Sequence, residues 1–330
     1  MTNVSRRQVL RLVPAAAMLP YAGARASVST GGYPTQPVSV IVPFGAGSST
    51  DYMARLMTNG LNARYPGRFI VDNKPGAGAS IGTAHVGKSS PDGSVLLYTT
   101  ATPFVINPFI YKKLAYEPRE FIPAARTVEL ALVLVVSATL GVRNFAELRR
   151  YLERNSKAAS YSSYGAGTSS HIAGAVLARK LELPELLHVP YKDTKAIPDL
   201  VAGRNTFHME AWSSVKPLVK AGQLVAIAVT SAHPVKWAPE LPTIASAIGT
   251  EYDIATWHGI FAPAKTPQSI VDFLNDEFRV RMESAETRQA CLDMGFNPYP
   301  HMTAEQFSAF VKRDATRWQG YVKEAGIQPE

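Results

Sequence analysis

The chain has 330 residues, of which 46% are hydrophobic, a share that is ordinary for a globular protein and too high for a disordered one. A single cysteine, Cys291, excludes an internal disulfide, a cysteine-based zinc site and an iron–sulfur cluster. The net charge is +8, and subtracting the four arginines of the acid-free first 26 residues leaves +4. No basic run or nucleic-acid-binding motif accompanies this mild charge, so nucleic acid is not an expected partner. The length predicts about two domains.

Residues 1–26 have the pattern of an export signal peptide. Arg6 and Arg7 form a basic start, an apolar run follows at 12–22, and Ala24-Arg25-Ala26 has small residues at cleavage spacing. The run is shorter than the ~20 residues that a bilayer span takes. The paired arginines favour the twin-arginine route over general secretion, and a plain N-terminal arm is the alternative. We expect removal of the signal near Ala26 and a periplasmic mature protein, where a lone cysteine suits the oxidising compartment.

Strand-length apolar runs then alternate with segments of helical period. The run 130–137 has no polar alternation, which predicts a strand buried on both faces. Asn144 with Glu147 and Thr303 with Gln306 have the spacing of capping boxes at helix starts. The predicted strands are 38–44, 69–73, 95–100, 130–137, 159–164, 186–191, 206–212, 224–230 and 254–262, and the predicted helices are 50–64, 144–155, 169–183, 193–202, 214–221 and three that start at 266, near 285 and at 303.

This alternation predicts an α/β fold with mixed, mostly parallel sheets covered by helices. The mature chain has no Pro/Gly/Ser-rich linker, so two lobes would be joined by ordered strands that cross near 126–129 and 230–232. We expect residues 27–127 and 230–330 to form lobe 1, with the C-terminal helices, and residues 128–229 to form lobe 2. The cleft between the lobes, at the carboxyl ends of strands, is then the expected ligand site.

Two glycine-rich loops nearly repeat each other. Gly45-Ala46-Gly47-Ser48-Ser49-Thr50 follows the first strand, Gly165-Ala166-Gly167-Thr168-Ser169-Ser170 follows the strand at 159–164, and each precedes a predicted helix. Glycines let backbone approach a ligand closely, and the hydroxyl residues suit helix caps. Because a helix N-terminus attracts anions, two of them facing each other would clamp a solute with an anionic group at one or both ends. The alternative is a pair of ordinary strand-to-helix turns.

Further motifs are spread over the mature chain. They are Tyr33-Pro34, Val42-Pro43-Phe44 with Gly47 and Asp51, Val71-x-Asn73-x-Pro75-Gly76-Ala77-Gly78, Pro91-Asp92-Gly93, Asn107-Pro108, Tyr111-Lys112-Lys113-Leu114, Gly165-x-Gly167-Thr168-Ser169-Ser170-His171, His188-Val189-Pro190-Tyr191-Lys192, Ala228-Val229-Thr230-Ser231, Pro242-Thr243, Trp257-x-Gly259 and Phe261-Ala262-Pro263-Ala264. With these motifs the chain resembles the Bug-type periplasmic solute receptors of tripartite tricarboxylate transporters.

The resemblance implies a two-lobed, type II-like (Venus-flytrap) binding protein, monomeric and without cofactor or metal, that is not an enzyme. It would close around a small carboxylate or amino-acid-like solute and deliver it to a tripartite tricarboxylate-type membrane permease. In such receptors the loop at 44–49 holds one carboxylate and the loop at 167–170 reaches the ligand from the other lobe. The ligand-binding residues that we expect are Phe44, Gly45, Ala46, Gly47, Ser48, Ser49, Thr100, Gly167, Thr168, Ser169 and Glu210.

The chain departs from the family pattern at two places that bear on the ligand. Gly45-Ala46-Gly47-Ser48 stands where the family usually has prolines and a glycine pair, and Glu210-Ala211 stands where an Asp-Asn pair is common. An ionised Glu210 in the cleft would repel a second carboxylate and favour an ammonium, amide or hydroxyl there. We therefore expect a monocarboxylate or amino-bearing ligand rather than citrate.

Enzyme motifs fail on their surroundings. Gly82–Ser89 matches G-x-x-x-x-G-K-[ST], but the segment reads as a short helix capped by Ser80 and stopped by Pro91, which is not a phosphate-binding loop. His208-Met209-Glu210 matches the H-x-E of zinc deaminases, whose P-C-x-x-C partner needs more than one cysteine. His171 is expected to be a structural side chain in the first turn of its helix. The alternative function is a secreted α/β enzyme that uses a glycine-rich loop as an oxyanion or phosphate cradle, for which we find no base and nucleophile.

Overall fold

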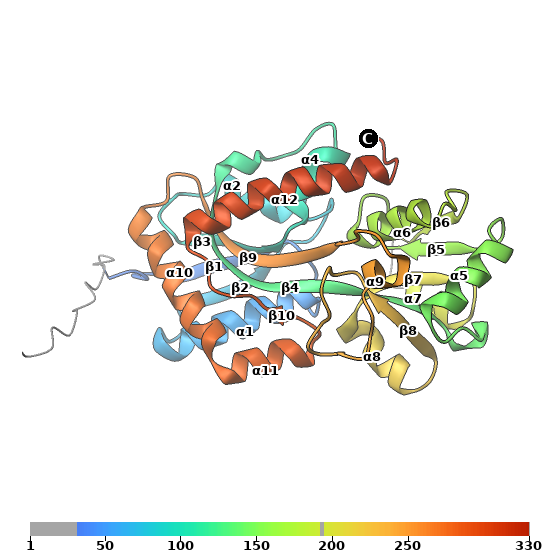
Figure 1. Cartoon of the computed structure of the whole chain (residues 1–330). Helices are drawn as coiled ribbons and strands as arrows, with labels where there is room; N and C mark the ends of the chain where they lie inside the picture. The colour runs from blue at the N-terminus through green and yellow to red at the C-terminus, as the bar shows by residue number, and fades with distance from the viewer. Residues whose placement is uncertain (1–31, 192–194, 330) are drawn as a thin grey trace, which may run out of the picture.

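The computed structural model describes residues 32–191 and 195–329 (Figure 1). The expected export signal and its cleavage near Ala26 lie outside the described residues. Within these residues a ten-stranded mixed sheet has the order β2-β1-β3-β9-β4-β7-β5-β6, and both β8 and β10 also pair with β4. Across the same ranges, none of the helices has both the length and the apolar character that crossing a bilayer takes.

The elements follow the expected alternation closely. The strands are β1 (Val38–Val42), β2 (Phe69–Asn73), β3 (Val95–Thr100), β4 (Phe121–Ser137), β5 (Ser160–Ser163), β6 (Leu187–Pro190), β7 (Phe207–Ala211), β8 (Leu224–Val229), β9 (Ala255–Pro263) and β10 (Asn297–Pro298). The helices are α1 (Ser49–Arg64), α2 (Ser80–Gly87), α3 (Thr102–Val105), α4 (Asn107–Ile110), α5 (Phe145–Arg154), α6 (Ser169–Lys180), α7 (Ala196–Val201), α8 (Trp212–Lys220), α9 (Ile244–Ile248), α10 (Gln268–Glu283), α11 (Ala285–Asp293) and α12 (Ala304–Glu324), with 3-10 turns at Pro118–Glu120 and Ala138–Leu140.

One strand joins the two parts of the sheet. Residues 121–131 of β4 pair with β9, whereas residues 132–137 pair with β7 and β8. We call β1, β2, β3, β9, β10 and residues 121–131 the first half, and β5 to β8 with residues 132–137 the second half. The partner of β4 changes at Ala131–Leu132, a few residues after the expected crossing at 126–129. The strand at 130–137 is buried on both faces, as predicted.

The return to the first half comes later than the sequence indicates. Segment 231–253 leaves β8, and Tyr252 in it donates a hydrogen bond of 2.8 Å to the carbonyl of Ala173 in α6 of the second half. The N–H of Ile254 then donates to the carbonyl of Thr230, and β9 begins one residue later. The chain therefore re-enters the first half at 253–255, not at 230–232. Segment 231–253 packs on the second half first, and β9 then continues along β4 in the same direction as β8.

Parallel pairing is confined to the outer strands. β1 is parallel to β2 and β3, and β5 is parallel to β6 and β7. The pairs that β4 forms with β7, β8, β9 and β10 are antiparallel, as is the β3–β9 pair. Antiparallel pairing therefore takes the centre, more than the βαβ alternation indicates, because β8 and β9 carry the chain back against the direction of β4.

Helices cover both faces of the sheet. Figure 1 shows α12 lying along one face, and its Trp318 and Phe307 are fully buried with Trp257 and Phe261 of β9. Helices α1, α10 and α11 supply the apolar side chains of the opposite face. Both predicted N-caps are present, but only one is a capping box. Thr303 and Gln306 bond reciprocally at the start of α12. At the start of α5, Asn144 Oδ1 accepts the N–H of Glu147 at 3.0 Å, whereas the Glu147 carboxylate accepts the N–H of Arg143 and not that of Asn144.

Two glycines provide a matched test of this packing. A Cβ on Gly259 of β9 would lie 2.7 Å from Phe307 Cζ and 2.8 Å from the carbonyl oxygen of Ala125, whereas a Cβ on Gly320 of α12 would meet nothing within 4 Å. We expect Gly259→Ala to lower the free energy of unfolding by about 1–3 kcal/mol through overpacking. Gly320→Ala should raise it by about 0.5–1 kcal/mol through helix propensity. Chemical denaturation measures both, and a Gly259→Ala protein as stable as wild type would contradict the described contact of β9, β4 and α12.

Candidate functional site

The two glycine-rich loops point toward the boundary between the halves from opposite sides. β1 is parallel to β3, β3 is antiparallel to β9, and β9 is antiparallel to β4, so β1 and β3 run with β4 toward the second half. β5 is parallel to β7, which is antiparallel to β4, so β5 runs toward the first half. The loop after β1 and the loop after β5 are therefore directed at each other, and Thr100, the last residue of β3, ends on the same side as the first loop.

The first loop is closed by its own hydrogen bonds. Gly47 has a φ of +82°, which glycine adopts without strain, and its N–H donates to Asp51 Oδ2 at 2.9 Å. Ser48 caps α1 by accepting the N–H of Asp51 on its Oγ at 3.2 Å, and its own N–H donates to the carbonyl of Gly45. The loop is thus fixed by residues within seven positions of one another.

Asp51 is the anchor of this loop. Its buried carboxylate also accepts Arg55 Nε at 3.0 Å and Asn73 Nδ2 at 2.9 Å, and Asn73 donates to the carbonyl of Phe44 at 3.0 Å. Burial acts to raise the pKa of Asp51, but the hydrogen bonds from Arg55, Gly47 and Asn73 outweigh it and hold that pKa below its ordinary value. The carboxylate therefore stays ionised and keeps Gly47 in place.

The second loop repeats these bonds position for position. Gly167 has a φ of +75°, and its N–H donates to His171 Nδ1 at 3.0 Å. Thr168 caps α6 by accepting the N–H of His171 on its Oγ1 at 3.4 Å, and its N–H donates to the carbonyl of Gly165 at 3.4 Å. The near-repeat in sequence is therefore a repeat in structure, with His171 in the place of Asp51. His171 is part of the first turn of its helix, as expected.

Both loops leave backbone donors unused. In the part of the chain that the structure describes, the N–H groups of Ser49 and Thr50 in the first turn of α1 have no hydrogen-bond acceptor, and the same is true of Ser169 and Ser170 in α6. These groups carry the partial positive charge of a helix N-terminus and suit a carboxylate. The Thr168 hydroxyl, unlike these N–H groups, has an acceptor inside the loop, because it donates to the carbonyl of Gly165 at 2.8 Å.

Contacts across the boundary bring other segments beside the loops. A Cβ on Gly167 would lie 2.2 Å from Ile110 Cδ1, so the second loop packs on the end of α4. Asn107 of α4 donates to the carbonyl of Gly78 at 2.8 Å, which places the third glycine-rich turn, 75–78, beside the same helix. Thr100 accepts the N–H of Thr102, the first residue of α3, on its Oγ1 at 3.3 Å.

Glu210 lies buried near the end of β7, where two protein groups donate to its carboxylate. Its Oε1 accepts the N–H of Ala211 at 2.7 Å, its Oε2 accepts the hydroxyl of Tyr164, and His208 Nε2 lies 3.3 Å from Oε2. Burial and the Glu210 charge both raise the pKa of Tyr164, so this phenol stays a donor. Tyr164, which directly follows β5 and is 42% exposed, was missed by the sequence analysis, although an aromatic side chain beside a glycine loop was a usable signal.

The nucleotide-loop pattern is a packed helix. Residues 80–87 form α2, and Lys88 and Ser89 follow its end instead of opening a helix. A Cβ on Gly82 would lie 2.8 Å from the carbonyl oxygen of Lys74, and one on Gly87 would lie 3.1 Å from Phe121 Cζ, so both glycines serve close packing. The expected Ser80 cap is wrong: Ala79 is the N-cap, and it makes no side-chain bond. Among the described side chains, no group of three or more His, Cys, Asp or Glu is arranged to hold a metal ion.

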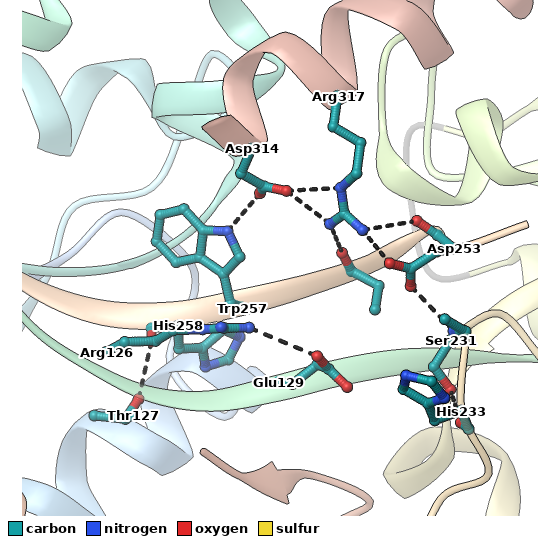
Figure 2. A network of polar contacts seen from close by, with 12 residues as sticks. Arg126, Thr127, Glu129, Ser231, His233, Asp253, Trp257, His258, Asp314 and Arg317 are labelled. Atoms are coloured by element: carbon teal, nitrogen blue, oxygen red, sulfur yellow. Dashed lines mark hydrogen bonds and ion pairs between the residues drawn. The ribbon is translucent and has the colours of Figure 1, made fainter. Parts of the chain in front are cut away.

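A charged network lies where the chain returns to the first half (Figure 2). Arg317 of α12 bonds the carboxylates of Asp253 and Asp314, the former accepts the N–H of Ala232 at 3.1 Å, and the latter accepts Trp257 Nε1 at 2.7 Å. The network therefore ties α12 to both ends of segment 231–253. Neither composition nor spacing pointed to it, because its members are spread from position 232 to position 317.

A hollow of about 350 Å³ borders this network. Arg126 lines it, with its guanidinium carbon 3.3 Å from the ring centre of Tyr299 and 4.2 Å from that of Phe310, and with Nη2 3.6 Å from Glu129. None of the expected ligand-binding residues lines this hollow. It is therefore separate from the facing glycine loops.

Residues 53–327 match the family described as "Tripartite tricarboxylate transporter family receptor". The chain belongs to this receptor family. It is 33% identical to the UPF0065 protein in the tcbD-tcbE intergenic region of a Pseudomonas species, over 98% of this chain and 96% of that protein. Among solved structures, R. palustris Rpa4515 with adipate has a TM-score of 0.82 at 29% identity, over 90% of this chain and 100% of its own. The periplasmic binding protein BugD has a TM-score of 0.79 at 30% identity, with the same coverage, which confirms the Bug-type resemblance.

The anchor of the first loop gives this receptor a testable pH dependence. Because the folded pKa of Asp51 lies below the unfolded value, its contribution is present at neutral pH and is lost as the pH falls below about 4. Asp51→Asn removes the charged acceptor of Gly47 and Arg55 and should lower the free energy of unfolding by about 1–3 kcal/mol at pH 7. Denaturation at pH 7, 5 and 3 should show the gap to wild type shrinking at the lowest pH, and a constant gap would contradict this role of the carboxylate.

Proposed function

We propose that this receptor captures a small carboxylated metabolite between its two halves and delivers it to a tripartite tricarboxylate-type membrane permease, without catalysis. The observation that carries the proposal is the repeated loop, in which two helix N-termini with unused N–H groups are directed at each other. Adipate in the Rpa4515 structure is a carboxylate of the kind that such a pair would hold. An amino-acid-like solute fits the same arrangement through its carboxylate.

The proposed contacts come from both halves. The first half would hold one carboxylate on the backbone of the first loop, and the second half would reach the solute through Ser169 and the N–H groups of α6. Glu210 with Tyr164 would face the other end of the solute, where an ionised Glu210 would repel a second carboxylate. The full proposed set is Phe44, Gly45, Ala46, Gly47, Ser48, Ser49, Thr100, Gly167, Thr168, Ser169 and Glu210.

Closure would occur by rotation of the lobes about the connecting strands. The expected lobes are residues 27–127 with 230–330 (lobe 1) and residues 128–229 (lobe 2). We propose the same lobes with segment 231–253 moved to lobe 2, because Tyr252 bonds to α6 there. We also propose that the receptor is a monomer in the periplasm and that its export signal is removed near Ala26. The expected twin-arginine route is part of the same proposal.

The enzyme alternative is less well supported. Two serine–histidine contacts lie near the second loop: Ser162 Oγ is 2.9 Å from His208 Nδ1, and Ser163 Oγ is 2.7 Å from His188 Nε2. Ser162 and His208 are at most 1% exposed, and Ser163 is completely buried. A substrate carbonyl therefore reaches neither serine hydroxyl. Mass spectrometry of the bound solute after long incubation separates the two functions, because a receptor returns it unchanged.

A thermal-shift screen with mono-, di- and tricarboxylates, acidic amino acids and adipate tests the proposal first. A carboxylate present at roughly 100 times its dissociation constant should stabilise the fold by about 2.7 kcal/mol, a readily visible shift. We expect monocarboxylates or amino-bearing acids to exceed citrate. Stabilisation by uncharged solutes alone would contradict an anion clamp.

Added charge in the loops tests the clamp directly. Ala46 and Ala166 are exposed at corresponding positions of the two loops, so aspartate there adds a like charge beside the unused N–H groups without filling a packed site. We expect Ala46→Asp and Ala166→Asp each to weaken carboxylate binding at least about tenfold by calorimetry, or about 1.4 kcal/mol. Gly167→Val is a poorer probe. Its side chain would collide with Ile110, so a loss of binding would not separate the anion contact from the packing of the loop.

The controls for this test lie outside the loops. Ala158→Asp places the same charge on an exposed residue before β5, and Lys88→Ala changes the residue that ends α2. Both should bind as wild type does. Loss of binding in Lys88→Ala together with normal binding in both loop variants would show that the clamp is wrong.

A further inference from the structure

Two histidine rings are stacked behind the second glycine loop. His171 of α6 and His188 of β6 have ring centres 3.8 Å apart and planes at 8° to each other. Tyr161 of β5 extends the stack, with its ring centre 5.1 Å from that of His188. The stack thus joins three consecutive elements of the second half, at the point where the loop leaves β5.

Each ring is tied to one end of the loop. His171 Nδ1 accepts the N–H of Gly167, which requires this nitrogen to carry no proton. His188 Nε2 lies 2.7 Å from Ser163 Oγ, and the same oxygen accepts the N–H of Gly165 at 3.1 Å. The positions of both glycines therefore depend on imidazoles, one directly and one through a serine hydroxyl.

The first loop has a different chemistry at the same place. There the acceptor of the glycine N–H is the carboxylate of Asp51, which stays ionised through the neutral and mildly acidic range. An imidazole instead exchanges an acceptor for a donor when it is protonated, and its ordinary pKa is about 6.5. The two loops therefore share their geometry but not their response to acid.

We propose that His171 is the positioning residue of the second loop and that, with His188, it makes solute capture fail in acid. A proton on Nδ1 of His171 would turn this nitrogen into a donor that points at the N–H of Gly167. The hydrogen bond between them would be lost, and the loop would leave the conformation that this bond holds. This inference rests on the proposed receptor function, since the loop is one of the two that would hold the solute.

The surroundings of the stack set the direction of the effect. Burial lowers the pKa of His171 to about 4, and burial together with His171 lowers that of His188 to about 4. The other titratable group in the stack is Tyr161, and among the described residues neither ring has an acidic ion-pair partner; the charges elsewhere on α6 are Arg179 and the Lys180–Glu324 pair at its far end.

Linkage then gives the pH window. When the second loop has its hydrogen bonds to the two imidazoles (the closed loop), neutral rings are favoured. When those bonds are broken (the opened loop), the rings return to an ordinary pKa of about 6.5. Opening therefore takes up protons once the pH falls below about 6.5, and it becomes more favourable down to about pH 4. Solute affinity should fall over the same range.

The test uses His171→Asn in the full-length exported protein, because the asparagine Oδ1 can accept the N–H of Gly167 but does not titrate. The first readout is the Gly167 amide signal of the solute-free protein in nuclear magnetic resonance from pH 7.5 to 3.5, a range that includes the lowered pKa of His171. We expect the signal to move with the His171 imidazole titration in wild type and to stay in place in His171→Asn. His85→Asn, which changes an exposed histidine on α2, should behave as wild type.

The second readout is calorimetry with adipate at pH 7.5 and 5.5. If adipate binds at pH 7.5, we expect a loss of affinity of about tenfold or more for wild type and His85→Asn and a clearly smaller loss for His171→Asn, in which only His188 still titrates, since titration of adipate itself affects all three equally. A Gly167 signal that ignores the His171 titration, or that still responds in His171→Asn, would overturn the inference whatever adipate does. Absence of adipate binding alongside the expected signal would agree with the proposed selection against a second carboxylate and would leave the positioning role standing.

Discussion

At a helix N-terminus the first backbone N–H groups have no hydrogen-bond acceptor within the same helix. The N-termini of α1 and α6 are two such ends, and the rest of the structure determines how they are placed. In each glycine-rich loop the capping hydroxyl, the glycine N–H and the glycine carbonyl all have partners inside the loop. Among the described residues, the N–H groups of the first two residues of each helix have no such partner. Because the loop geometry is fixed by its own bonds, these donors are held in place before any solute arrives, which reduces the cost of ordering them on binding.

The sheet brings the two ends together. β4 runs through both halves without a break, and β8 and β9 return along it in the opposite direction. This antiparallel centre reverses the direction of the outer parallel strands between the halves, so the carboxyl ends of β1 and β5 face one boundary. The Arg317 network ties α12 to segment 231–253 at the same place (Figure 2). The Lys180–Glu324 pair adds a contact between α6 and α12, so α12 is joined to the second half at more than one place.

Local features of the sequence predicted much of this fold. The capping residues Asn144 and Thr303, the buried run at 130–137 and the two glycine-rich loops were all correctly located, because each depends on residues within a few positions. The first part of β4 was missed because Pro123, Arg126 and Glu129 interrupt its apolar pattern. The late return of the chain was missed as well, since it depends on Tyr252 contacting α6, a pairing of residues 79 positions apart.

The candidate site was predictable to the same extent. The loops followed from their repeat, but the exchange of Asp51 for His171 as loop anchor became meaningful only once both were seen to accept a glycine N–H. Likewise, Gly82 and Gly87 fit a phosphate-loop pattern in sequence, and only their contacts with Lys74 and Phe121 show that they allow close packing. Spacing alone could not separate these roles, because the deciding neighbours are distant in sequence.

The central claim is that one solute is held by both helix N-termini at once. The most direct measurement is the change in backbone amide signals when a carboxylate found by thermal shift is titrated into the isotopically labelled receptor. If both N-termini hold one solute, the amides of Ser49 and Thr50 and those of Ser169 and Ser170 should shift together, with one common dissociation constant. Shifts confined to one loop, or centred on the hollow beside Arg126 with both loops unchanged, would contradict it.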